Sequence, residues 1–83
     1  MSYFEVLCQG SKFHRVDRKS DRSLAIYPAE DSDEYWLGFQ ELVAAAEENA
    51  GDEYEVMPHK NYRRDLPEWF GRPVYDMAII SLT

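Results

Sequence analysis

Residues 31–51 of this chain read DSDEYWLGFQELVAAAEENAG, and no other stretch predicts its structure as strongly. Apolar residues recur there at the spacing i, i+1, i+4, i+7, i+8 and i+11, which is typical of one face of a helix. They are Tyr35, Trp36, Phe39, Leu42, Val43 and Ala46. Asp31, with Glu34 three residues later, resembles a capping box, and Ser32 is a second candidate for the N-cap. Gly51 suits the turn that follows a helix. The sequence therefore predicts an amphipathic helix over about 33–49.

Segments rich in strand-forming residues lie on both sides of this helix. The predicted strands are 3–8, 12–16, 23–27, 54–57 and 74–82. Pro28 and Pro58 are expected to end the third and fourth of them. Residues 17–22 contain no apolar side chain, which predicts a solvated loop. Asp65 and Glu68 are spaced like an N-cap and its partner, so one short helical turn is expected at 66–70.

The order of these elements predicts a single α+β domain over residues 1–83. We expect a mainly antiparallel sheet of about four to five strands, with the long helix packed on one face and the short helical turn before the last strand. Cys8 is the only cysteine, which excludes an internal disulfide and is typical of a reducing compartment. The N-terminal residues do not resemble a secretory signal, and the apolar stretches are too short to span a membrane. These observations predict a cytoplasmic protein.

Charge is distributed unevenly along the chain, whose net charge is −7. Ten acidic residues and no Lys or Arg lie between Glu30 and Glu55. Glu34, Glu41 and Glu48 are seven residues apart, so they are expected to face solvent opposite the apolar stripe. Acids in the last helical turn are disfavoured by the helix dipole, and no basic residue is interleaved to compensate them. The negative charge is therefore not explained by the stability of the helix.

A concentrated negative field repels nucleic acids and anionic membranes and attracts basic protein surfaces. The leading hypothesis is a non-catalytic inhibitor that presents carboxylates to a basic protein that handles nucleic acid, as nucleic-acid mimics of phage type do. The partner-binding residues would be Asp31, Asp33, Glu34, Glu41, Glu48 and Asp52. A face that serves only solubility would carry the same charges, and this alternative stays open.

Aromatic and basic residues after the fourth predicted strand suggest a second hypothesis, a structural or regulatory subunit with an aromatic binding surface. Its anchors would be Trp36, Tyr62, Arg63, Arg64, Trp69 and Phe70. Trp69 and Phe70 are better explained as a cap on the sheet, with the nearby arginines offsetting the acidic helix. Self-association is a further hypothesis, because the basic loop at 17–22 of one copy could contact the acidic helix of another in a homodimer.

Few residues are candidates for catalysis. Cys8, His14 and His59 are the only thiol and imidazole groups, and no motif for a nucleophile, a phosphate or a zinc ion is present. Asp31 and Asp33 begin like a calcium loop, but its sixth and twelfth positions hold Trp36 and Leu42 instead of Gly and Glu. We therefore predict no enzyme activity, no metal and no cofactor, with a small enzyme using these three residues as the remaining alternative.

Overall fold

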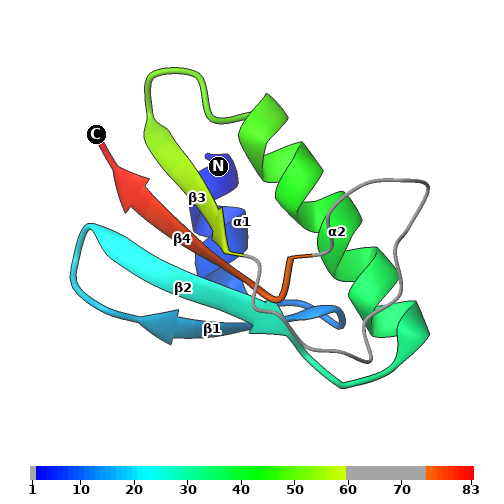
Figure 1. Cartoon of the computed structure of the whole chain (residues 1–83). Coiled ribbons are helices and arrows are strands. Elements are labelled where there is room, and N and C mark those ends of the chain that lie inside the picture. The colour runs from blue at the N-terminus through cyan, green and yellow to red at the C-terminus, as the bar shows by residue number, and fades with distance from the viewer. Residues whose placement is uncertain (1, 60–74) are drawn as a thin grey trace.

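The computed structural model describes residues 2–59 and 75–83 of the chain (Figure 1). It contains two helices and four strands in those residues. In chain order they are α1 (Tyr3–Gln9), β1 (His14–Arg18), β2 (Ser23–Pro28), α2 (Asp33–Glu48), β3 (Tyr54–His59) and β4 (Met77–Leu82).

The four strands form one antiparallel sheet with the order β1-β2-β4-β3. The last strand in sequence, β4, lies in the interior of the sheet and pairs with both β2 and β3. Strands β1 and β3 form the two edges of this sheet. The prediction of an α+β domain with a mainly antiparallel sheet and one long helix is confirmed.

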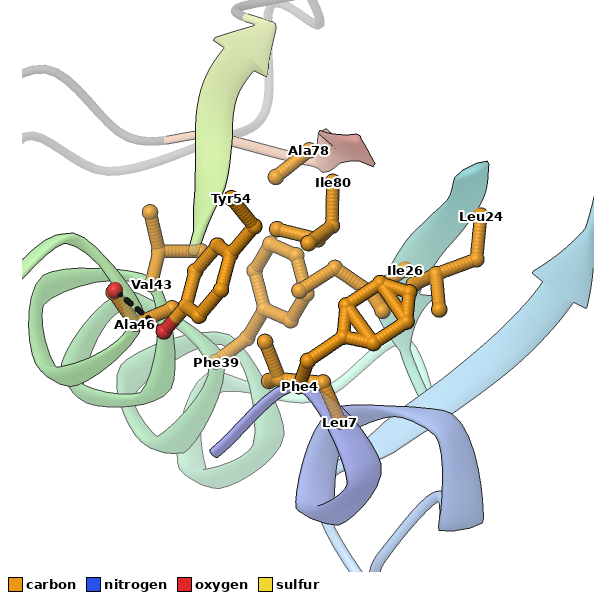
Figure 2. Packing of buried hydrophobic residues seen from close by; sticks show 10 residues of the cluster. All are labelled: Phe4, Leu7, Leu24, Ile26, Phe39, Val43, Ala46, Tyr54, Ala78 and Ile80. Carbon is orange, nitrogen blue, oxygen red and sulfur yellow. Dashed lines mark hydrogen bonds between the residues drawn. The ribbon is translucent and has the colours of Figure 1, made fainter. Parts of the chain in front are cut away.

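Both helices pack on one face of the sheet. Leu24 and Ile26 of β2 lie opposite Ile80 and Ala78 of β4, and all four side chains are buried. Side chains from both helices and from β3 complete the cluster shown in Figure 2: Phe4, Leu7, Phe39, Val43, Ala46 and Tyr54. The Tyr54 hydroxyl donates a hydrogen bond of 2.7 Å to the Ala46 carbonyl, which satisfies its polar atom within the core. Burying one large apolar side chain contributes roughly 1.5–3 kcal/mol, so this cluster is the main source of stability.

Helix α2 confirms the predicted stripe and nearly the predicted bounds. Ser32, the second of the two candidate caps, is the N-cap, and its hydroxyl accepts a hydrogen bond from the Tyr35 N–H at 3.4 Å. Asp31 accepts a hydrogen bond from the indole N–H of Trp36 instead. Asn49 is the C-cap, and Gly51 follows with a φ of 51°, a conformation that glycine adopts without strain.

The predicted strand at residues 3–8 is wrong, because this segment is helix α1. Ser2 caps it by accepting a hydrogen bond from the Glu5 N–H. Phe4 and Leu7, three residues apart, face the core together, whereas Val6 is exposed. A strand would instead have placed Phe4 and Val6 on the same face. In so short a segment an alternating pattern and a helical pattern overlap, and packing against the sheet selects the helix.

The β1–β2 hairpin also departs from the prediction. Strand β1 is His14–Arg18 and not 12–16, so Asp17 and Arg18 pair with β2 and do not belong to the solvated loop. Backbone pairing across a hairpin does not require apolar side chains, so a hydropathy pattern does not predict a strand made of polar residues.

Strand β3 continues through Pro58 to His59, although Pro58 was expected to end it. The Thr83 N–H donates a hydrogen bond of 3.1 Å to the Glu53 carbonyl, so residue 53 is hydrogen-bonded to the chain at the end of β4. In an antiparallel ladder, every second residue of a strand is hydrogen-bonded to the same neighbouring strand. The backbone N–H and C=O groups of residues 55, 57 and 59 are therefore directed toward β4. The backbone of Pro58 is directed toward the outer edge of the sheet, so its missing N–H removes no hydrogen bond of the ladder. Strand β4 begins at Met77 and not at 74. The short helical turn expected at 66–70 lies outside the described residues.

We predict that Gly38→Ala destabilises the protein, although alanine favours a helix by about 1 kcal/mol over glycine. A Cβ at residue 38 would lie 2.6 Å from Cδ1 and 2.7 Å from Cγ of Phe13, so the ring would have to move. Overpacking of this kind typically costs about 1–3 kcal/mol. The free energy of unfolding in urea should therefore fall.

The matched control is the same substitution in a Phe13→Ala background, where the ring is gone and Gly38→Ala should stabilise by about 1 kcal/mol. Stabilisation of equal size in both backgrounds would contradict this reading of the contact.

Candidate functional site

The six acids predicted to bind a partner are all exposed: Asp31, Asp33, Glu34, Glu41, Glu48 and Asp52. Three of them, Glu34, Glu41 and Glu48, lie along α2 on the side opposite its buried residues, and we call them the acidic line. At a rise of 1.5 Å per residue, their seven-residue spacing separates successive side chains by about 10.5 Å along the helix axis. The acidic line is therefore straight, exposed and carried on a helix whose other face is anchored in the core.

Little of this charge is neutralised within the described part of the chain. Glu34 approaches the ammonium group of Lys12 at 3.7 Å, with side-chain exposures of 68% and 65%. Pairs this exposed contribute at most about 1 kcal/mol, because water and salt screen them. Across residues 2–59 and 75–83, Glu41 and Glu48 make no ion pair. Asp31 differs from the others, because its carboxylate accepts a 2.8 Å hydrogen bond from Trp36 Nε1.

The basic residues of the β1–β2 hairpin bind to groups other than the acidic line. Lys19 pairs with Asp17 at 2.8 Å, and Arg22 donates to the Thr83 carbonyl at 2.9 Å. Arg15 lies over the ring of Tyr27, 5.5 Å from its centre. These contacts leave the hairpin basic on its surface, and the homodimer hypothesis stays a prediction.

The aromatic surface of the second hypothesis is mostly outside the described residues. Tyr62, Arg63, Arg64, Trp69 and Phe70 all belong to that part of the chain. Trp36, in the first turn of α2, does not fit the role of an exposed anchor, because it is only 3% exposed. The hypothesis for Trp36 was therefore wrong, and its aromatic ring stabilises the fold.

Of the three candidate catalytic residues, His14 has the most specific environment. It is only 2% exposed, and both ring nitrogens have partners. The Nε2–H group donates to the Leu7 carbonyl at 3.0 Å, and Nδ1 accepts from the Ser11 hydroxyl at 2.6 Å. Burial lowers the pKa of His14, and the bond to Leu7 only partly opposes this effect.

The pairing of Ser11 with His14 was not foreseen from the sequence. The hydroxyl of Ser11 also accepts a hydrogen bond from the Phe13 N–H at 3.1 Å, as it does in a polar turn. Together these bonds tie the end of α1 to the start of β1. The available signal was a serine three residues before a histidine, directly after Gly10. We interpret this arrangement as structural, because its hydrogen bonds connect α1 to β1; we call Ser11 and His14 the joint.

The other two candidates have ordinary positions. Cys8 is half-buried and packs against the core cluster, as predicted for a core thiol, although from a helix. His59 is half-buried at the end of β3, and its carbonyl accepts a hydrogen bond from the Asp76 N–H. Among the described residues, no three His, Cys, Asp or Glu side chains are grouped as metal ligands. In the same residues, neither helix combines the length and hydropathy needed to cross a membrane.

Comparison of the chain with protein-family models, with curated proteins and with solved structures finds no match. Any functional assignment must therefore come from the chemistry of this chain's own residues.

We predict that acid destabilises this protein partly through His14. The unfolded chain binds a proton at the ordinary histidine pKa of about 6.5, whereas the folded state binds it only at lower pH. The resulting stabilisation is fully present above that ordinary pKa and is lost as pH falls through the folded pKa. Urea unfolding at pH 7.5 and pH 5 should show a lower free energy of unfolding at pH 5.

The variant His14→Gln removes this titration but keeps hydrogen-bonding atoms at the joint. Its free energy of unfolding should change less between the two pH values than that of the unchanged protein. An equal change in both proteins would assign the effect to other groups.

Proposed function

We propose that this protein is a non-catalytic binding module that docks the acidic line on a basic surface of a protein that handles nucleic acid. The observation that carries the proposal is the exposure of Glu34, Glu41 and Glu48 along one side of α2. Neither Glu41 nor Glu48 makes an ion pair within the described residues. The consequence of docking would be inhibition, because the bound module would occupy the surface that nucleic acid requires.

The spacing of the acidic line sets the kind of contact. At physiological salt, charges are screened over about 8 Å, which is less than the separation of about 10.5 Å between successive carboxylates. Each carboxylate would therefore act on its own Lys or Arg of the partner. Three such contacts, each modest, would together give an association that is fast and weakens as salt rises.

The scaffold of the acidic line favours binding through its rigidity. Helix α2 is capped by Ser32 and held by Phe39, Val43 and Ala46 in the core. A rigid helix loses little backbone entropy when it binds, so more of the electrostatic attraction is retained as affinity. Because α2 has no basic residues, the acids near its carboxyl end lower the stability of the helix. A cationic partner would supply the missing positive charge.

The test begins with a partner captured from cells of the source organism and then purified. This module should displace labelled DNA or RNA from that partner, as measured by fluorescence anisotropy. Reversing Glu34, Glu41 and Glu48 together to Lys should weaken binding at least about a hundredfold, because three attractive contacts become repulsive. The dependence of affinity on salt should also decrease.

A control with the same change in net charge is the reversal of Glu5, Asp17 and Asp21, which are exposed outside α2. It should reduce affinity far less. Unchanged binding by the α2 variant, or equal losses in both variants, would refute the proposal. If nucleic acid stays bound to the partner, the inhibitory role fails while docking itself survives.

A further inference from the structure

A surface groove of about 330 Å³ lies between the end of α2 and the edge strand β3, and we call it the exit groove. Its lining residues are Glu47, Ala50, Tyr54, Glu55, Val56 and Met57. Four of these are apolar or aromatic, and among the described residues Met57, at 52%, and Val6 are the exposed large hydrophobic residues. The exit groove therefore combines an apolar floor with a carboxylate from each of the two elements that form it.

The charges of the exit groove select cations. Glu47 is in the last turn of α2 and Glu55 is in β3, and both are exposed. Neither makes an ion pair in the part of the chain that the structure describes. The carboxyl end of a helix carries a partial negative charge, which adds to that of Glu47. A Lys or Arg side chain suits this groove, because its charged head can pair with a carboxylate while its apolar methylene stem packs on the apolar residues.

The outer edge of β3 offers backbone groups to the same groove. Residues 55, 57 and 59 bond to β4, so the N–H and C=O groups of residues 54 and 56 are directed away from the sheet. Tyr54 is only 1% exposed, so its backbone groups are covered. Val56 is half-buried, so of the two residues it is the one that can present a backbone donor and acceptor at the surface. Within residues 2–59 and 75–83, no strand pairs with this edge.

We propose that the exit groove binds an extended basic segment of a partner protein. The segment would pair its backbone with the N–H and C=O groups of Val56, as a strand added to a sheet edge does. Because side chains alternate along a strand, those on one side would lie against Ala50 and Glu47, and those on the other against Met57 and Glu55. Lys or Arg at these positions meets one carboxylate on each side.

A second copy of this chain is a poor occupant of the exit groove. Each copy carries a net charge of −7, and two β3 edges paired at Val56 would place Glu55 of one copy opposite Met57 of the other, so neither carboxylate of the groove would meet a cation. Two copies with the same negative net charge also repel each other. The inference shares with the proposed function only the cationic class of partner. It uses no residue of the acidic line, so either can fail alone.

The probe is a synthetic peptide of alternating Lys and Val, about seven residues long. Its binding to the unchanged protein is measured by calorimetry, and amide hydrogen exchange is followed by NMR. The Val56 amide should exchange at least about tenfold more slowly when the peptide is bound. A peptide of the same charge, N-methylated at alternate residues so that it cannot pair as a strand, should not give this protection. Equal binding by both peptides, or an unprotected Val56 amide, would overturn the proposal.

The side chains are tested by the double variant Glu47→Gln and Glu55→Gln, which should weaken peptide binding by about five- to tenfold. The control is Glu34→Gln with Glu41→Gln, which removes the same charge from α2 outside the exit groove and should change affinity by less than about twofold. Equal losses in both variants would show attraction to net charge alone and would overturn the proposal. In the Glu34→Gln, Glu41→Gln variant, the bound peptide should still slow the amide exchange of Val56. This result separates the test from that of the proposed function, which depends on the acidic line.

Discussion

The burial of one side of α2 against the sheet is the constraint on which the rest of the structure depends. Phe39, Val43 and Ala46 meet β2, β3 and β4 in a single cluster, and Tyr54 is tied to α2 by its hydroxyl (Figure 2). Within the described residues one apolar cluster stabilises the fold, as is expected of a chain of 83 residues. Once this side of α2 is buried, its rotation is determined, and the acidic line must face solvent.

The same constraint explains how an acid-rich helix is tolerated. Apolar burial contributes roughly 1.5–3 kcal/mol for each large side chain, whereas acids near the carboxyl end of a helix cost roughly 0.3–1 kcal/mol. The core therefore outweighs the unfavourable electrostatics of Glu47 and Glu48. Local instability of this size is compatible with the fold and leaves a surface whose charge a cationic partner would complement.

The edges of the sheet show how position decides the role of a residue. Pro58 and Val56 have the same orientation in β3, toward the outer edge. Proline has no N–H to offer there, so it limits strand addition, while Val56 keeps its donor and acceptor. At the other edge of the sheet, Ser11 and His14 join α1 to β1 through hydrogen bonds of the buried His14 side chain. These polar contacts thus help to orient α1, in addition to the apolar contacts of Phe4 and Leu7 with the core.

The amino-acid sequence by itself determined α2, its buried stripe, the exposure of the acidic line and the α+β class, because a helical period over sixteen residues has few alternative explanations. It also indicated four of the strands, although not their exact ends. Only tertiary structure decided that residues 3–9 are helical, that Trp36 is buried, and that Glu47 and Glu55 border one groove. The reason is physical: a seven-residue segment fits two periods, and residues from different elements become neighbours only when the sheet order is established.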